Sequence, residues 1–118
     1  MSHRHRSERL GELFRRELTR LLLGSLKDPR LDGVTVTDVR ATRDLSFATV
    51  YIRSDEDVSE GIEGLEHAAG FIRRELGRSL RLRKIPEFRF LADETPEHAS
   101  RIEELLRRTR QDWGSRDD

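Results

Sequence analysis

The chain has 118 residues, which is enough for one ordinary domain with its own core and too few for two. Only 34% of the residues are hydrophobic and 39% are charged, which favours a lean core in a small α+β domain. Cysteine is absent, which excludes disulfides, thiolate nucleophiles and cysteine-based zinc sites. No apolar run has the length of a signal sequence or a membrane span, so we expect a soluble protein of the cytoplasm with no membrane contact.

The formal net charge is zero, but the charges are distributed unevenly along the chain. Residues 55–67 hold six acidic residues and no lysine or arginine. Residues 70–90 hold seven lysines and arginines against two acids, and the first thirty residues hold eight against four. The net charge therefore hides a dipolar molecule.

The first elements in chain order are a helix and a hairpin. Ser7 is the expected cap of a helix that runs to about Leu23 and stops at Gly24, with an apolar face made by Leu10, Leu13, Phe14, Leu18 and Leu21. The turn-rich "KDPRLDG" follows. Two strand-like runs, 34–42 and 46–53, are separated by a short polar link and predict a β-hairpin. In the second run one face, Ala48, Val50 and Ile52, is expected to cover a core, and the other, Phe47, Thr49 and Tyr51, to remain wet.

The second half of the chain returns to a helical period. From about Ser59 an apolar stripe runs to Leu80, and it is interrupted by the small residues Ala68, Ala69 and Gly70. These residues favour a kink, although close packing of a helix against Gly70 is an equally acceptable interpretation. A strand over 85–93 follows. Thr95, Pro96 and Glu97 then open a C-terminal helix whose apolar positions are Ile102, Leu105, Leu106, Thr109 and Trp113.

Candidate catalytic groups are few. His3 and His5 lie in an arginine-flanked terminus, which is typical of a mobile tail rather than a metal site. His67 follows Glu63 by four residues, but a single such pair on an acidic helix face is usually solvated. Asp93 and Glu94 are adjacent carboxylates, and the simpler explanation for them is that their charges stabilise the start of the helix that follows. No nucleotide-binding, nucleophile-elbow or zinc-protease motif occurs, so we expect no enzyme, no cofactor and no metal.

Basic residues on the second helical stretch predict contact with nucleic acid. At about 100° per residue, Arg74, Arg78 and Arg81 lie together opposite the core direction set by Ile72. Such a row can contact a phosphate backbone, and counterion release would make the contact strong and salt-dependent. The other expected RNA-binding residues are Arg73, Arg83 and Lys84 beside this row and Arg4, Arg6 and Arg9 near the first helix.

The sequence also holds a G-x-x-G, formed by Gly61 to Gly64, which is the pattern that a KH domain uses to hold a nucleic-acid backbone. This copy precedes its helix, contains a glutamate and lies in the acidic segment, where phosphate would be repelled. The corresponding place between two helices is 68–70, which offers no loop.

Five segments resemble the bacterial ribosome-binding factor A family: "LKDPRL" (26–31), "VTVTDV" (34–39), "DLSFATVYI" (44–52), "AAGFIRRELGRSLRLRKIPEFRF" (68–90) and "RIEELL" (101–106). The resemblance spans about residues 6–107 and is most specific over 68–90. It implies a single KH-like domain of the second type, α-β-β-α-kink-α-β with a C-terminal helix. It also implies that an Ala-x-Gly kink, here Ala68, Ala69 and Gly70, replaces the G-x-x-G loop. A glutamate-histidine-alanine stretch at 97–99 stands where members often have glycine.

The same resemblance implies a function and a domain plan. It implies binding to the immature 30S small ribosomal subunit, help in maturing the 5′ end of its 16S rRNA, a role in cold adaptation, assembly GTPases as functional neighbours, and a monomer. The expected plan is a flexible tail over 1–6, a ribosome-binding domain over 7–107 and a helix end and tail over 108–118. Two alternatives remain: a protein-interaction module that uses the basic helix without RNA contact, and a small hydrolase or metal enzyme that uses His67 or His98.

Overall fold

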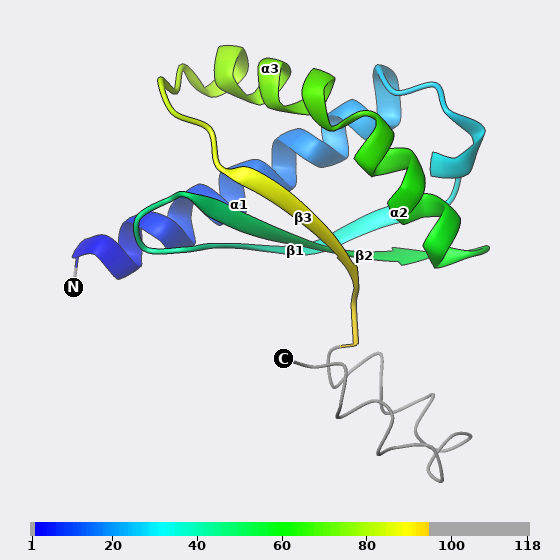
Figure 1. Cartoon of the computed structure of the whole chain (residues 1–118), viewed down its shortest axis with the longest axis horizontal. Helices are drawn as coiled ribbons and strands as arrows, with labels where there is room; N and C mark the ends of the chain where they lie inside the picture. Colours follow the sequence, from blue (N-terminus) through cyan, green and yellow to red (C-terminus); the bar gives the residue numbers. More distant parts are fainter. Residues whose placement is uncertain (1, 95–118) are drawn as a thin grey trace, which may run out of the picture.

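The computed structural model describes residues 2–94, with side chains from Arg6 onward. Its elements are α1 (Ser2–Gly24), the short 3-10 helix η1 (Pro29–Leu31), β1 (Val34–Ala41), β2 (Phe47–Ser54), α2 (Val58–His67), α3 (Ala69–Leu80) and β3 (Glu87–Ala92) (Figure 1). The predicted α+β class and the order α-β-β-α-α-β are confirmed. The predicted C-terminal helix from Thr95 onward lies outside the described residues.

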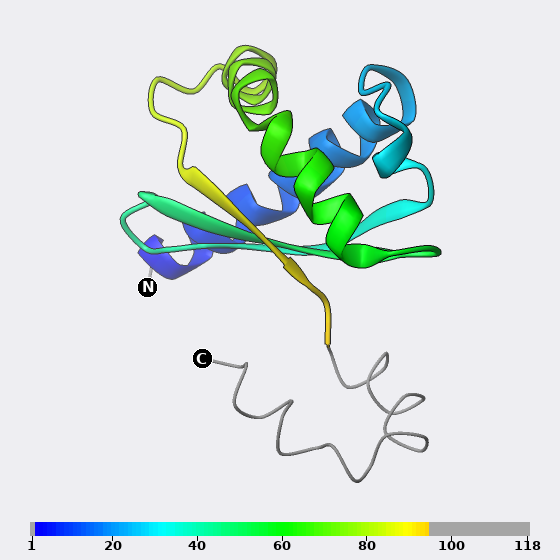
Figure 2. The ribbon, with the colours of Figure 1, turned by 45° about the vertical axis from the view of Figure 1, so that its right-hand side comes forward.

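The three strands form one mixed sheet with β2 in the centre. β1 and β2 are the predicted hairpin and pair antiparallel, whereas β2 and β3 pair parallel. The parallel pair requires the chain to cross over from the end of β2 to the start of β3, and α2 and α3 make this crossover. All three α-helices lie on the same face of the sheet, so the fold has two layers (Figures 1 and 2).

The core lies between these two layers. The alternation predicted for β2 is confirmed, because Ala48, Val50 and Ile52 are at most 1% exposed while Phe47 is 48% exposed. The helices contribute six more fully buried side chains, which are Phe14, Leu18, Leu21, Leu65, Ile72 and Leu76, and the loop before β3 contributes Pro86. From β3, Phe90 is buried, and Phe88 packs edge-to-face on Phe14 with ring centroids 5.4 Å apart.

The start of α1 differs from the sequence prediction. The helix begins at Ser2, so Ser7 is not its cap, and most of the stretch expected to be a tail over 1–6 is helical. Ser7 is only 7% exposed, and Gly11 is also buried. These two small residues extend the buried stripe of Phe14 at helical spacing, and a Cβ on Gly11 would lie 2.4 Å from the carbonyl oxygen of Val39. Small residues give no hydrophobic signal, so the periodicity did not show that the stripe continues to Ser7.

Helix α2 starts after Asp57, whose carboxylate accepts a hydrogen bond of 3.0 Å from the backbone amide of Ser59. Both glycines of the G-x-x-G lie inside this helix and are buried, so the prediction that the pattern precedes its helix was wrong. A Cβ on Gly61 would lie 2.8 Å from Val34, and one on Gly64 would lie 2.9 Å from Leu31. The pattern is therefore a close packing surface of α2 and not a loop that could hold phosphate.

The helical stretch breaks at Ala68, between α2 and α3. The backbone of Ala68 has φ −91° and ψ 6°, and its amide is shared between the carbonyl oxygens of Gly64 and Leu65 at 3.1 Å each. The two helices have different packing partners, since α2 packs on η1 and α3 on α1. A Cβ on Gly70 would meet only the Nη1 atom of Arg74, 3.8 Å away, and Gly70 does not have a positive φ. Close packing therefore does not explain this glycine.

Candidate nucleic-acid interface

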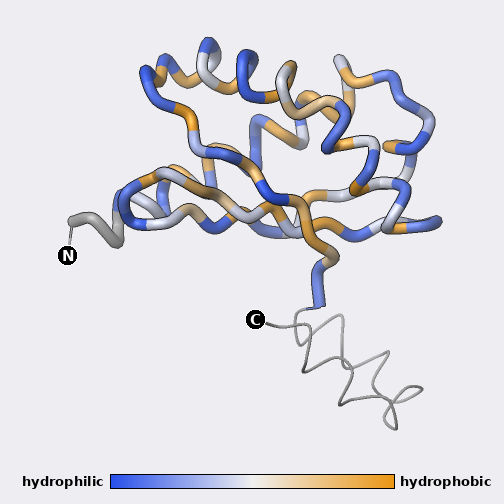
Figure 3. The backbone as a smooth tube through the Cα atoms, viewed as in Figure 1, coloured by the Kyte–Doolittle hydropathy of each residue, from blue (hydrophilic) through white to orange (hydrophobic). Residues whose placement is uncertain are grey.

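Helix α3 has one face in the core and one face in solvent. Ile72 and Leu76 are fully buried, while Arg74 and Arg78 on the opposite side are exposed. Hydrophilic residues follow the outer side of α3 in Figure 3. The helix is fixed to α1 by a hydrogen bond of 2.9 Å from the hydroxyl of Ser79 to the carboxylate of Glu17. The outer face of α3 is therefore a basic surface on a well-anchored element.

Arg73 has a different environment from its neighbours. Its Nη2 atom donates to the carbonyl oxygen of Ile85 at 3.1 Å, and its Nε atom donates to that of Pro86 at 3.3 Å. The loop that follows α3 also approaches the helix closely, because a Cβ on Gly77 would lie 3.3 Å from Ile85. The guanidinium of Arg73 thus holds the α3–β3 loop in place, and because Arg73 is also exposed, its predicted contact with RNA stays a prediction.

Arg81 ends the helix in an uncommon backbone conformation. It lies in the left-handed region with φ 55° and ψ 45°. The amide of Leu82 donates to the carbonyl oxygen of Gly77 at 2.9 Å, and that of Arg81 donates to Arg78 at 3.3 Å. This pair of bonds is a Schellman motif, in which the left-handed position is usually glycine. An arginine there costs free energy that glycine would not, and its exposed side chain extends the basic row of α3.

The other members of the row keep their guanidinium groups accessible. Arg78 forms a 2.7 Å ion pair with Glu75, but its side chain is still 76% exposed. Arg74 is exposed one turn earlier. Because exposed ion pairs of this kind contribute little to stability, the partner of Arg78 can be exchanged for another anion at small cost.

The α3–β3 loop adds further cations, and it lies beside the tip of the β-hairpin. Arg83 and Lys84 are exposed in this loop. The amide of Glu87 donates to the carbonyl oxygen of Ser46 at 2.9 Å, which joins the end of the loop to the hairpin. Arg43, exposed at the hairpin tip, is a nearby cation that helical spacing could not indicate.

The hairpin tip is itself held by a network around Asp44. Hydrogen bonds from the hydroxyl and the amide of Ser46, and from the hydroxyl of Thr42, lower the pKa of Asp44 to about 2, with a smaller contribution from the charge of Lys84. The carboxylate of Asp44 therefore stays ionised at neutral pH and can accept these three hydrogen bonds.

The cations near the start of α1 form a separate group. Arg6 and Arg9 are exposed, and the side chain of Arg4 lies outside the described part of the structure. The start of α1 and the hairpin tip lie at the same end of the domain (Figures 1 and 2). The sequence analysis placed these arginines near the first helix, and the fold has them in α1; their contact with RNA stays a prediction.

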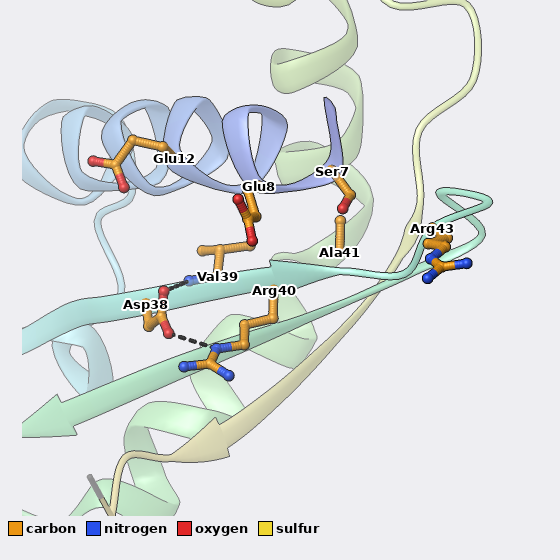
Figure 4. Close-up of a pocket in the computed structure, with 8 residues that line it drawn as sticks. All are labelled: Ser7, Glu8, Glu12, Asp38, Val39, Arg40, Ala41 and Arg43. Carbon is orange, nitrogen blue, oxygen red and sulfur yellow. Dashed lines mark hydrogen bonds and ion pairs between the residues drawn. The ribbon is translucent and has the colours of Figure 1, made fainter. Parts of the chain in front are cut away.

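A cleft of about 670 Å³ lies between the first half of α1 and β1. It is lined by Ser7, Glu8, Glu12, Asp38, Val39, Arg40, Ala41 and Arg43 (Figure 4). Two of its carboxylates have cationic partners: Asp38 accepts a hydrogen bond of 2.9 Å from Arg40, and the hydrogen bond from Arg15 lowers the pKa of Glu12. Among the residues with described side chains, no group of three or more histidines and acids could hold a metal ion.

The acidic residues of the α2 region lie apart from the basic side of α3. Asp55, Glu60, Glu63 and Glu66 are exposed on α2 and the turn before it, and His67 is exposed at the end of α2. The charge of α2 and α3 therefore changes sign where the two helices meet, so the dipole seen in the sequence is present in the fold. No helix within residues 2–94 is long and apolar enough to cross a membrane.

Comparisons with known proteins agree on one family. The family described as ribosome-binding factor A matches residues 6–106. Curated ribosome-binding factor A proteins are 43% identical over 104 residues in Thioalkalivibrio sulfidiphilus and 42% identical over 113 residues in Streptococcus pneumoniae. The first alignment covers 86% of this chain and 81% of the relative, and the second covers 91% of this chain and 96% of the relative.

Solved structures with the same fold belong to this family. The crystal structure of ribosome-binding factor A from Thermus thermophilus has a TM-score of 0.69 and 29% identity, covering 73% of this chain and 93% of that one. A homology model of Thermus thermophilus ribosome-binding factor A, fitted into a cryo-EM map of its complex with the 30S subunit, has a TM-score of 0.65 and 29% identity; the match covers 74% of this chain and 94% of that one. The predicted KH-like fold is confirmed, and the chain belongs to the ribosome-binding factor A family.

Proposed function

We propose that this protein binds the immature 30S small ribosomal subunit through the exposed basic side of α3 and the loop that follows it. The family is named for ribosome binding, and a Thermus thermophilus relative has been fitted into a map of its complex with the 30S subunit. The observation that carries the proposal for this chain is the row of Arg74, Arg78 and Arg81, exposed on a helix whose opposite face is fully buried.

The binding mode follows from the chemistry of this surface. Guanidinium groups form bidentate contacts with phosphate, and such contacts position a protein without reading base sequence. Arg83 and Lys84 extend the surface past the end of the helix, and Arg4, Arg6 and Arg9 supply a second group of cations at the start of α1. Specificity for the subunit then comes from the shape of folded 16S rRNA and from neighbouring ribosomal proteins.

The acidic side of α2 has an orienting role in this proposal. Its carboxylates, on residues 55–66, are repelled by phosphate, so they turn away from the rRNA while α3 turns toward it. The break at Ala68 sets the angle between these two surfaces. Arg73 positions the α3–β3 loop and keeps Arg83 and Lys84 close to the basic row.

The biological role proposed for the protein is that of a non-enzymatic assembly factor. It acts as a monomer in the cytoplasm, assists maturation of the 5′ end of 16S rRNA, including during cold adaptation, and leaves the subunit when maturation ends. Assembly GTPases are the expected functional neighbours. Family membership supports this role, and no cofactor or metal is part of it.

Charge reversal tests the proposal directly. The variant Arg74→Glu/Arg78→Glu should lose co-sedimentation with small ribosomal subunits while its circular dichroism spectrum and melting temperature remain close to those of the wild type. The matched control is Arg16→Glu/Lys27→Glu, which reverses two exposed cations on α1 and just after it. Equal co-sedimentation of the two variants would remove the basic side of α3 from the binding surface. Binding to a purified acidic protein but not to the subunit would favour the protein-interaction module instead.

A further inference from the structure

The sheet has a second face, which the helices do not cover. On β2 the side chains of Phe47, Thr49 and Tyr51 point to this face, because their neighbours Ala48, Val50 and Ile52 are buried under the helices. Phe47 is 48% exposed and Leu91 of β3 is 41% exposed. Figures 1 and 2 show no helix of the described chain on this side of the sheet.

The strand register places two arginines on this uncovered face, on either side of the β2 row. Thr49 pairs with Arg40 of β1 and with Arg89 of β3. Residues that pair directly across strands point to the same face, so all three side chains share it. The backbones of Arg40 and Arg89 are about 9 to 10 Å apart, because neighbouring strands are about 4.8 Å apart. Figure 4 shows the side chain of Arg40 extending from β1 away from α1.

The charges of this face favour an anionic ligand. The cations are Arg40, Arg53 and Arg89, all exposed. The acids are Asp38, which already accepts a 2.9 Å hydrogen bond from Arg40, Glu87, which pairs with Phe47, and Asp93, just after β3, whose charge adds to the hydrogen bond with Asp38 in raising the pKa of Arg40. These six charges sum to zero, but Asp93 is only 4% exposed and Asp38 is already bonded to Arg40, so the accessible charges are mainly those of the arginines.

The aromatic side chains restrict the ligand further. Phe47 and Tyr51 are four residues apart on one strand, which corresponds to about 13 Å, with the small Thr49 between them. Aromatic rings on an open sheet, interleaved with arginines, are suited to unpaired bases, because every base has a π-face that can stack and a phosphate that an arginine can contact. Paired bases within a duplex do not expose their faces in this way.

We propose that the uncovered face of the sheet binds a short stretch of single-stranded RNA. Phe47 and Tyr51 each stack on an unpaired base of the strand, with at least one nucleotide between the two bases, and Arg40 and Arg89 contact the phosphates beside them. This site is separate from the basic side of α3, which lies on the opposite layer of the fold. The identity of the natural ligand rests on the proposed function: on the ribosome, the strand would be an unpaired segment of 16S rRNA.

Fluorescence anisotropy of a labelled heptauridylate, titrated with the full-length protein, tests this site without the ribosome. Loss of one stacking ring in Phe47→Ser should weaken binding by about 5- to 100-fold. Arg89→Gln should weaken it and reduce the salt slope by about 0.7. The matched controls, Leu23→Ser and Arg16→Gln, change a side chain that is 84% exposed and an exposed arginine on α1, and they should bind like the wild type. Equal affinities for Phe47→Ser and Leu23→Ser would overturn the proposal.

Two further measurements distinguish this site from the basic side of α3 and from a face covered by the end of the chain. The variant Arg74→Glu/Arg78→Glu should keep most of its affinity for heptauridylate while it loses binding to the small subunit. The loss of binding to both ligands would show that α3 binds the single strand and would overturn the sheet site.

The only tryptophan, Trp113, reports on the chain that follows β3. If Phe47→Ser shifts the fluorescence emission of Trp113 in the absence of RNA, residues 95–118 occupy the uncovered face of the sheet, and the proposal fails.

Discussion

The left-handed arginine at the end of α3 allows stability and binding to be tested separately. Arg81 has φ 55° in a Schellman motif, and its side chain is exposed. The left-handed conformation costs an L-residue about 1 to 2 kcal/mol and glycine almost nothing. Glycine gives back about 0.5 to 1 kcal/mol through the greater freedom of the unfolded chain. Arg81→Gly should therefore raise the free energy of unfolding by about 0.5 to 1 kcal/mol, or the melting temperature by about 2 to 6 °C.

The assay is thermal unfolding followed by far-ultraviolet circular dichroism, with Arg81→Ala as the matched control. Alanine also removes the guanidinium but keeps the left-handed penalty, so it should melt close to the wild type. Both variants should lose affinity for small ribosomal subunits to a similar extent, because both remove the same phosphate contact. Equal melting temperatures for the glycine and alanine variants would refute the argument that Arg81 holds an unfavourable backbone conformation for the sake of its side chain.

The glycine packing and the hairpin tip give three other predictions. Gly11→Ala places a methyl group 2.4 Å from a carbonyl oxygen of β1 and should lower the free energy of unfolding by about 1 to 3 kcal/mol in urea titrations, whereas Gly24→Ala, with nothing within 4 Å, should change it by less than about 0.5 kcal/mol. Gly70→Ala should keep the bend and be neutral or stabilising by up to about 1 kcal/mol, and an altered chemical-shift pattern across both α2 and α3 would contradict this. The pKa of Asp44 lies at about 2, below that of an aspartate in the unfolded chain. Its stabilisation of the hairpin tip is therefore complete above about pH 4 and is lost as the pH falls through 2. The variant Ser46→Ala should raise the pKa of Asp44 in an NMR titration, and a wild-type Asp44 that titrates near 4 would count against the hydrogen-bond network.

Much of the fold was predictable because its elements carry strong periodic signals. The alternation of Ala48, Val50 and Ile52 identified the buried face of β2, and the turn-rich segment before β1 marked where the hairpin begins. The apolar stripe through Ile72 and Leu76 also identified which side of α3 faces solvent. Each of these signals depends on residues that are close together in the sequence, so local reasoning was sufficient.

The features that were missed depend on contacts between distant segments. Gly11 is required by the carbonyl oxygen of Val39, and Arg73 contacts two carbonyl groups beyond α3; neither partner can be inferred from helical spacing. Likewise, Arg40 and Arg89 are 49 residues apart in the chain and share a face only because both pair with Thr49. Such relations follow from strand register and packing, and the sequence alone does not specify them.

The most direct test of the proposed interface is the salt dependence of binding to small ribosomal subunits. About five phosphate contacts predict that the affinity of the wild type falls with roughly the fourth power of the salt concentration. Arg74→Ala/Arg78→Ala should give a logarithmic slope that is shallower by about 1.5 to 2, because two phosphate contacts are lost. Parallel lines for the two proteins, displaced or not, would mean that these arginines do not contact phosphate and would contradict the account.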